Sequence, residues 1–198
     1  MVKLFWSAAS PYVRKVMACA IARDLHERIT LITTNPQESP ADLLAANPLS
    51  KVPCLVTEDG LALFDSPVIC EYLDSREDAA PLFPRAGAAR WVALRLQALA
   101  DGVMDASVAR RQDAMRPPDT ARTAAMARHK AAIDRALAML EAGVPHQALD
   151  IGTISLGCAL GYLDFRFAHE PWRSACPQLA AWLTAFAAHP CMAQTAPR

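Results

Sequence analysis

Residues 47–66 read N-P-L-S-K-V-P-C-L-V-T-E-D-G-L-A-L-F-D-S, and this stretch decides the fold. A Val-Pro step stands ahead of one short apolar strand pattern, Cys54–Thr57, and a second pattern follows at Leu61–Phe64. Gly60 in the Glu-Asp-Gly segment between them supplies the backbone freedom that a tight hairpin turn requires. An Asp-Ser-Pro sequence comes next. The stretch therefore predicts a β-hairpin that leads directly into a helix.

The helix that begins after Phe64 carries polar groups at its start. Ser66 is predicted to be its N-cap, with Pro67 at the first helical position, where no N–H is needed. The free N–H groups and the dipole of a helix start favour an anion, while Asp65 offers a carboxylate to a cation. An anion site beside a cation site suits the zwitterionic amino end of a peptide. The alternative, from these residues alone, is a capped helix with an acidic neighbour.

Val52-Pro53 stands where the first strand pattern begins. Because proline cannot donate to a sheet ladder, it belongs at an edge, a strand start or a bulge. A cis bond would make a sharp turn here and would leave the Val52 N–H and C=O free to pair with an extended peptide. A trans proline at a sheet edge is the alternative, and the sequence does not choose between the two.

The beginning of the chain supplies a hydroxyl group. Val2–Trp6 predicts a short buried strand, and Pro11 opens a helix that runs to about Asp24. Ser10 either caps that helix or donates a hydrogen bond to a bound thiolate, and Ser7 is a competing hydroxyl in the same loop. One charge-assisted hydrogen bond of about 1.5–3 kcal/mol, aided by the helix dipole, is enough to lower a thiol pKa by roughly 2 units.

The order of the patterns changes in the middle of the chain. Up to about Glu77 it runs strand, helix, strand, helix, strand, strand, helix, with a strand at Arg28–Thr33 and a short helix at Pro40–Ala46. After it, every long pattern is helical. The predicted helices span about 87–112, 120–142, 151–168 and, as the last one, 177–188. Asp150 is predicted to cap the third of these, with Thr153 at its third position.

Apolar spacing predicts which helix faces are buried. Trp91 heads the buried set of the long helix, Val68 belongs to the buried face of the helix after Phe64, and the helix that begins at residue 151 is apolar nearly all round and should be central. Arg14 and Lys15, one turn into the first helix, are expected to be solvated.

Three segments together resemble the N-terminal domain of the glutathione S-transferase family, and small bacterial serine-type members in particular. They are Ser10-Pro11-Tyr12-Val13-Arg14-Lys15, Asn47-Pro48-x-x-Lys51-Val52-Pro53 and Asp65-Ser66-Pro67. The resemblance extends over the whole chain, because its length and its helical second half also fit. It implies a thioredoxin-like α/β domain of order βαβαββα with a mixed four-stranded sheet, followed by an all-α domain. The implied boundaries are 1–77 for the glutathione-binding domain, 78–86 for a linker and 87–198 for the helical domain.

The resemblance also implies roles for individual residues. Ser10, or Ser7 as second choice, would stabilise the glutathione thiolate. Val52 would pair with the cysteinyl backbone ahead of Pro53, Asp65 and Ser66 would hold the γ-glutamyl end, and Lys51 would lie near the glycyl end. The family more often has Glu where Asp65 stands. The helical domain would line the electrophile pocket, with Met104, Asp105, Val108 and Tyr162 as candidates.

Composition narrows the class of protein. A formal net charge of zero gives no reason to expect nucleic acid or an acidic membrane as partner, and no apolar run approaches the ~18 residues that span a bilayer. The six cysteines include no C-x-x-C, and no paired histidine spacing suggests a metal site. Buried thiols in a reduced cytoplasm are expected, and Cys54 is expected to face the core rather than to act as a nucleophile.

The predicted function is that of a glutathione transferase, in which the thiolate of the co-substrate glutathione attacks a small hydrophobic electrophile. A homodimer and a role in detoxification follow from the family alone. One alternative is a glutathione-binding protein with a regulatory rather than a catalytic role. Another is a glutathione-dependent isomerase, dehalogenase or lyase. Thiol transfer is disfavoured, because Ser10 and Val13 stand where glutaredoxins have cysteines in a Cys-Pro-Tyr-Cys motif.

Overall fold

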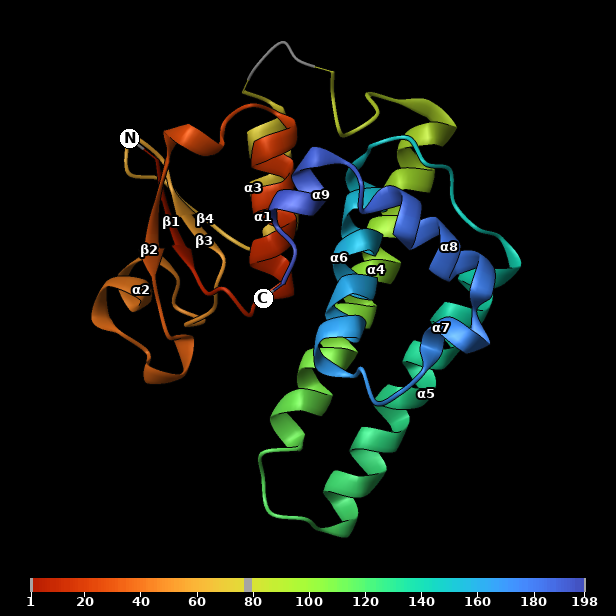
Figure 1. The fold of residues 1–198 in the computed structure, drawn as a ribbon. Coiled ribbons are helices and arrows are strands. Elements are labelled where there is room, and N and C mark those ends of the chain that lie inside the picture. The colour runs from red at the N-terminus through yellow and green to blue at the C-terminus, as the bar shows by residue number, and fades with distance from the viewer. Residues whose placement is uncertain (1, 77–79, 198) are drawn as a thin grey trace.

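The computed structural model describes residues 2–76 and 80–197. The predicted domain boundary at residues 77 and 78 and the first part of the predicted linker lie outside the described residues. In Figure 1, the sheet and the helices that cover it lie at the left, and a group of longer helices lies at the right. The thioredoxin-like domain and the all-helical domain predicted from the sequence are therefore both confirmed.

A mixed sheet of four strands forms the centre of the first domain. The strands are β1 (Val2–Trp6), β2 (Ile29–Thr33), β3 (Cys54–Val56) and β4 (Ala62–Leu63), in the order β2-β1-β3-β4. β1 pairs in parallel with β2 and antiparallel with β3, which pairs antiparallel with β4. The predicted hairpin is confirmed, with Gly60 at a positive φ of 89° in its turn.

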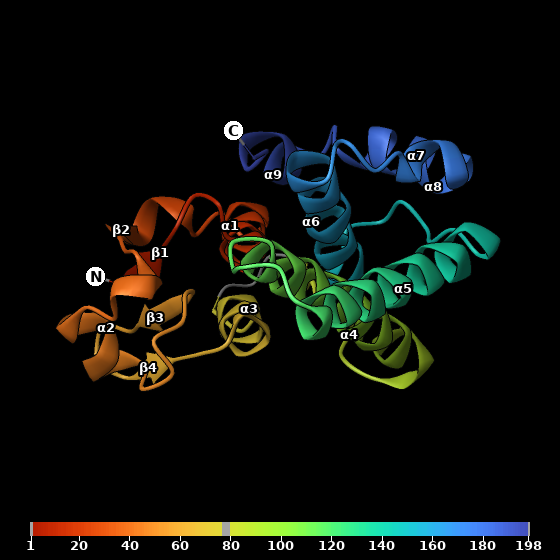
Figure 2. The same ribbon diagram turned by 90° about the horizontal axis from the view of Figure 1, so that it is seen from below.

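Helices cover both faces of this sheet. They are α1 (Pro11–Ala22), α2 (Ala41–Ala46) and α3 (Ser66–Asp74), with short 3₁₀ turns at His26–Arg28 and Pro36–Glu38. Leu4 and Leu55 belong to the main core, which includes α1 and α3, whereas Phe5 and Cys54 pack with Leu43 of α2. In Figures 1 and 2, α1 and α3 lie between the sheet and the second domain, and α2 lies beyond the sheet.

The second domain is helical throughout its described part. Its helices are α4 (Gly87–Asp113), α5 (Thr120–Ala142), α6 (Ile151–Arg166), α7 (Trp172–Ala175), α8 (Pro177–Phe186) and α9 (Pro190–Gln194). The sequence did not predict α7 and α9, because helices of four and five residues are too short to show a periodic pattern. α6 is central as predicted, and it packs against α1, α4, α8 and α9. No helix in the described part of the chain is long and apolar enough to cross a membrane.

Two predicted core residues lie at the surface instead. Trp91 on α4 is 69% exposed and Val68 on α3 is 45% exposed. α4 approaches α6 so closely that a Cβ built on Gly152 would lie 2.6 Å from the Ala93 carbonyl oxygen. The approach leaves no room for a side chain at position 152, and the buried Ala93, not the exposed Trp91, lies on the face of α4 that meets α6.

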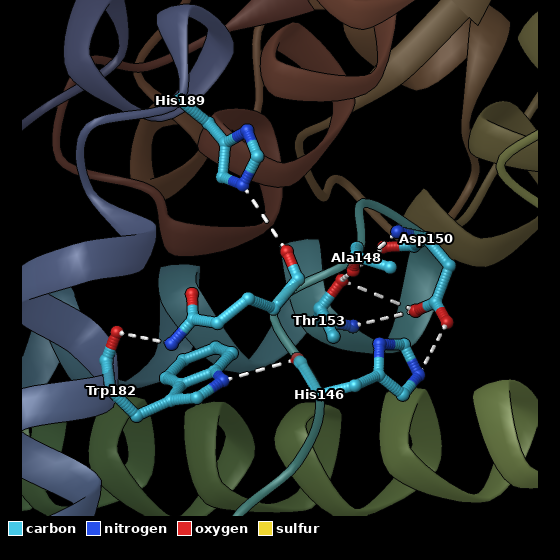
Figure 3. Close-up of polar contacts among 7 residues, drawn as sticks. His146, Ala148, Asp150, Thr153, Trp182 and His189 are labelled. Atoms are coloured by element: carbon cyan, nitrogen blue, oxygen red, sulfur yellow. Dashed lines mark hydrogen bonds and ion pairs between the residues drawn. The ribbon is translucent and has the colours of Figure 1, made fainter.

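A capping box begins α6, as predicted (Figure 3). The Thr153 N–H donates to the Asp150 carboxylate, and the Asp150 N–H donates to the Thr153 hydroxyl, both at 2.9 Å. The Thr153 hydroxyl donates to the Ala148 carbonyl oxygen, and the Trp182 indole N–H donates to the His146 carbonyl oxygen. This network ties the loop before α6 to α8 and satisfies the polar groups at the helix start.

Lys15 is buried and Arg14 is half-buried between the domains, so the prediction that they are solvated is wrong. The Arg14 guanidinium donates to the carbonyl oxygens of Gly157 on α6 and Met192 on α9, at 3.4 and 3.3 Å. Lys15 is fully buried, and its ammonium lies 2.7 Å from the Asp101 carboxylate on α4. The pattern of α1 alone could not reveal this, because the helices that cover these two side chains come much later in the chain.

Candidate active site

A cavity of about 860 Å³ lies where the two domains meet. Its wall combines loop residues of the first domain with residues of α4 and α6. The lining residues are Ser7, Ala9, Ser10, Pro11, Tyr12, Asn35, Pro36, Gln37, Ser39, Leu49, Ser50, Lys51, Val52, Pro53, Asp65, Ser66, Asp105, Val108, Ala109, Gln112 and Tyr162. Nearly every residue singled out from the sequence as a candidate site residue therefore lies at one cavity.

Ser10 lies at the N-terminus of α1 and lines the cavity. Its side-chain oxygen accepts from the Val13 N–H at 3.3 Å, so Ser10 caps the helix as one of the two sequence interpretations predicted. A hydroxyl that accepts one hydrogen bond still has its own proton to donate. Capping α1 and donating to a ligand are therefore compatible. Ser7 lines the same cavity, so both hydroxyls are near the site.

The Val52-Pro53 peptide bond is cis. Val52 lines the cavity and lies ahead of the point where β3 begins to pair with β1, because the ladder register starts at Cys54. Its backbone is thus placed beside the cavity and outside the sheet ladder. This is the position from which a backbone can pair with an extended peptide.

Asp65 and Ser66 form the start of α3 at the cavity wall. Asp65 is the N-cap residue and makes no side-chain capping bond, while Ser66 is the first residue of the helix and is 2% exposed. The prediction that Ser66 is the N-cap is therefore wrong by one residue. Because Asp65 adopts the extended backbone of a cap, the helix begins at Ser66, one residue earlier than predicted.

Further carboxylates lie near the start of α3. Asp101 of α4 is close enough to both Asp65 and Asp105 for its charge to be repelled by theirs. Burial raises the pKa of Asp101, although the Lys15 ammonium opposes that shift. Three carboxylates near one buried ammonium make this end of the cavity favourable for a further positive charge.

The other end of the cavity is lined by polar residues of the first domain. Lys51 lines the cavity, and its place near the glycyl end of glutathione stays a prediction; Asn35 and Gln37, which the sequence did not single out, line the cavity too. The Asn35 side chain caps the turn that follows β2 by accepting from the Gln37 N–H at 3.2 Å. Both residues follow the carboxyl end of a strand, where open α/β sheets place their ligand sites, and that position could have identified them.

α4 presents one face to the cavity. Asp105 and Val108 line it as predicted, and Ala109 and Gln112 continue the same face at helical spacing. Tyr162 of α6 also lines the cavity. Met104, by contrast, is fully buried in the core and lines no part of the cavity, because it lies on a different face of α4.

None of the six cysteines lines the cavity. All six are free and buried, and Cys54 packs on the α2 side of the sheet, as predicted for a core residue. Burial raises the pKa of the Cys54 thiol to about 11, which keeps it protonated at neutral pH. Within residues 2–76 and 80–197, His, Cys, Asp and Glu form no group of three that could hold a metal ion.

Two family models match the chain. The model described as glutathione S-transferase, N-terminal domain matches residues 9–76, and the one described as glutathione S-transferase, C-terminal domain matches residues 123–185. A sequence relative, the uncharacterized GST-like protein YibF of Escherichia coli K12, is 33% identical over 175 residues, which make up 86% of each chain.

Solved structures match the whole chain. A crystal structure of a glutathione transferase family member from Pseudomonas fluorescens Pf-5, with bound glutathione, is 43% identical, and the match covers 100% of both chains with a TM-score of 0.93. Another crystal structure of a family member from the same strain contains S-(propanoic acid)-glutathione, with 42% identity, 100% of both chains covered and a TM-score of 0.87.

Proposed function

Because this chain belongs to the glutathione S-transferase family, we propose that it binds glutathione in the cavity between its domains and activates the thiol for attack on a small electrophile. The Pseudomonas fluorescens relative with bound glutathione supports the choice of ligand, since it matches over the full length of this chain. The residues of the site are proposed to bind the three parts of the tripeptide separately.

Asp65 and Ser66 are proposed to hold the γ-glutamyl end. The α-carboxylate would accept from the first N–H groups of α3 and from the Ser66 hydroxyl, because a helix start favours an anion. The α-ammonium would lie against the Asp65 carboxylate, and the nearby charge of Asp101 supports a cation there. Zwitterion recognition thus needs no residue beyond those already at the helix start.

Val52 and Lys51 are proposed to hold the rest of the tripeptide. The free Val52 backbone would pair with the cysteinyl residue in the manner of a short added strand. Lys51 would attract the glycyl carboxylate from the rim of the cavity. Two fixed ends and a paired centre leave the sulfur near the start of α1.

Ser10 carries the catalytic part of the proposal. The single most important observation is that its hydroxyl lines the cavity at the N-terminus of α1 and accepts the Val13 N–H, so its proton is left to donate. A thiolate at this position would receive that hydrogen bond and the favourable end of the helix dipole. The electrophile would be held against Val108, Ala109 and Tyr162. The relative that contains S-(propanoic acid)-glutathione supports room for a short group on the sulfur.

A homodimer in the cytoplasm and a role in detoxification remain predictions from the family. Exposed apolar side chains on neighbouring helices support a dimer, namely Val68 on α3 with Trp91 and Val92 on α4. The Arg90 guanidinium joins these helices by donating to the Glu71 carboxylate at 2.9 Å. Sedimentation equilibrium of the full chain tests whether the protein is a dimer.

The central test is a titration of the thiolate absorbance of bound glutathione. In the wild type, the bound thiol should ionise at lower pH than free glutathione. Ser10→Ala should raise the thiol pKa by roughly 1–2 units, the value of one charge-assisted hydrogen bond. Ser7→Ala is the matched control, since it removes a hydroxyl from the same loop, and it should leave the pKa shift in place.

Two results would contradict the assignment. If Ser7→Ala abolished the shift and Ser10→Ala did not, Ser7 would be the thiolate partner. If the wild type bound no glutathione at millimolar concentration, the proposed function would be wrong. A glutathione-binding regulatory protein would instead bind the tripeptide and show no conjugation with any electrophile, and an isomerase, dehalogenase or lyase would release glutathione unchanged or form it from a conjugate.

A further inference from the structure

The Arg14 side chain extends from the first turn of α1 into the second domain. Its two terminal nitrogens donate to different helices, one to the Gly157 carbonyl oxygen of α6 at 3.4 Å and the other to the Met192 carbonyl oxygen of α9 at 3.3 Å. Figure 1 shows α9 beside both α1 and α6, and the three helices contact one another. One guanidinium therefore joins three helices from two domains.

α6 has a glycine at the point where this guanidinium lies. A Cβ built on Gly161 would lie 2.2 Å from Nη1 of Arg14, so a side chain fits there only if the guanidinium moves away. One turn earlier, a Cβ built on Gly157 would lie 2.7 Å from the methyl carbon of Met192. Glycine inside a helix is less favourable than alanine, because it loses more backbone freedom on folding. The space that Arg14 and α9 occupy explains both glycines.

The same arginine is attached to Ser10 through the backbone. The Arg14 N–H donates to the Ser10 carbonyl oxygen at 3.1 Å, and this bond closes the first turn of α1. The Ser10 N–H in turn donates to the Ser7 carbonyl oxygen at 3.1 Å. Ser10 and Arg14 also line one small recess, which shares several lining residues with the main cavity, Ser10 among them. A displacement of Arg14 would thus reach Ser10 over a single turn of helix.

A helix end frays readily, whereas a hydroxyl that stabilises a charge must be held within about 0.5 Å of its productive place. We propose that Arg14 is a positioning residue for Ser10: its guanidinium locks the first turn of α1 to α6 and α9, and so holds the Ser10 hydroxyl where it donates to the bound thiolate. This inference rests on the proposed function. Arg14 acts from behind Ser10, since the described residues that line the main cavity do not include it.

The Arg14 charge also acts through space on thiols in this part of the protein. Burial raises the pKa of the Cys158 thiol to about 11, and the Arg14 charge opposes that rise. Cys158 lines the same recess as Ser10. A direct effect of the Arg14 charge on the glutathione thiolate is therefore the alternative to positioning, and the experiment must separate position from charge.

The test measures the pKa of the thiol of bound glutathione in the full-length protein by its thiolate absorbance. Gly161→Ala keeps the Arg14 charge but takes the space of its guanidinium, and Arg14→Lys keeps the charge but replaces two terminal nitrogens by one. Each variant should raise the thiol pKa by roughly 0.5–1 unit, because a displaced hydroxyl loses part of one charge-assisted hydrogen bond. Calorimetry with S-methylglutathione, which has no thiol to ionise, should show unchanged affinity. A loss of that affinity would mean that Arg14 shapes the whole site, and would overturn the inference.

A double-mutant cycle with Ser10→Ala decides between position and charge. Arg14→Met should raise the thiol pKa by roughly 0.5–1 unit in the wild-type background. In the Ser10→Ala background it should change the thiol pKa by less than about 0.3 unit, because the hydroxyl that it positions is gone. Equal shifts in the two backgrounds would show that the charge acts by itself, and would overturn the inference. Gly161→Ala takes the place of Arg14→Met in this cycle should the latter fail to fold.

Gly102→Ala is the matched control for Gly161→Ala. Gly102 lies on α4, and a Cβ built on it meets no atom within 4 Å, so this variant should leave the thiol pKa unchanged. If Ser10→Ala raised the thiol pKa while Gly161→Ala and Arg14→Lys did not, the inference alone would be wrong. If the wild type did not lower the thiol pKa of bound glutathione, or Ser10→Ala had no effect on it, the proposed function would be wrong as well.

Discussion

Among the described helices, α3, α5 and α6 begin with an aspartate at the N-cap, and the aspartates of α3 and α6 do different things. Asp150 at the start of α6 accepts the Thr153 N–H at 2.9 Å and completes a capping box within the chain. Asp65 at the start of α3 makes no capping bond with its side chain and lines the cavity instead. The same residue type at the same helix position therefore serves the fold in one case and is available to a ligand in the other.

Ser10 lies between these two extremes. Its oxygen accepts from α1 like a structural cap, while its own proton remains to be donated and the residue lines the cavity. The comparison teaches that a cap becomes a candidate site when the helix leaves part of its hydrogen-bonding capacity unused. That criterion requires the structure, because the sequence shows only that a capping residue is present.

Lys15 provides the strongest test of the distinction between residues that stabilise the fold and residues that bind a ligand. Its buried ammonium pairs with Asp101, and Asp101 lies near Asp65. Lys15→Met should lower the free energy of unfolding by about 3 kcal/mol, since it leaves the Asp101 carboxylate without its ammonium partner. The extra negative charge beside Asp65 should also change the glutathione affinity. Urea unfolding and calorimetry on the same variant measure both effects.

The control for Lys15 is the double variant Lys15→Met with Asp101→Leu. Removing both charges should restore most of the lost stability, because a buried ion pair replaced by apolar groups is often neutral. If the double variant were less stable than Lys15→Met alone, the loss would come from packing rather than from an unpaired charge.

The pair Asp65→Ala and Asp150→Ala tests the comparison directly. Asp65→Ala should weaken glutathione binding by about 1.5–3 kcal/mol, or roughly 10- to 100-fold in Kd, because it removes a charged partner of the ammonium. It should change the unfolding free energy by less than about 0.5 kcal/mol. Asp150→Ala should do the reverse, with about 1–2 kcal/mol of stability lost and glutathione affinity retained. Calorimetry and urea unfolding of both variants separate the two effects.

The comparison would fail if the two variants behaved alike. Equal losses of stability would mean that Asp65 stabilises α3 despite the missing capping bond. Equal losses of affinity would mean that the α6 start controls the cavity from a distance.

Much of the fold was predictable from local signals. Gly60 marks the hairpin turn, Pro11 marks a helix start, and the Asp150 and Thr153 pair marks a cap, so each of these elements was placed correctly. The two residues at the start of α3 were identified as a pair, although the cap belongs to Asp65 rather than Ser66. Local hydrogen-bonding and backbone preferences carry this information because they act within a few residues.

The failures come from contacts between distant segments. Lys15 was expected in solvent because its partner Asp101 lies 86 residues later. Met104 was expected at the cavity and Trp91 in the core because apolar spacing on a long helix fixes the faces only after its neighbours are known. The hydrogen bond from Tyr12 to Asp105 could not be predicted either, because the two residues lie 93 positions apart.

Glu170, like Asp150, is a carboxylate whose hydrogen-bond donors come from the protein itself. It gives a test with a smaller expected effect. Its carboxylate accepts from both terminal nitrogens of Arg110, whose guanidinium lies 4.5 Å from the centre of the Phe167 ring. The hydrogen bonds from Arg110 lower the pKa of Glu170, and partial burial opposes this only in part. A lowered pKa means that the unfolded chain takes up the proton first as pH falls from neutral. The stability that this pair contributes is therefore present above the unfolded pKa of about 4.3 and is lost below it, as pH falls through the folded pKa.

Glu170→Gln should remove that acid-dependent part of the stability. Because the side chain is 27% exposed, solvent screening limits the effect to about 0.5 kcal/mol. The difference in unfolding free energy between about pH 7 and about pH 3 should be smaller by this amount in the variant than in the wild type. Glutathione affinity at neutral pH should be unchanged, since Glu170 is absent from the cavity wall. A variant that lost affinity but kept the full pH dependence would place Glu170 with Asp65 rather than with Asp150.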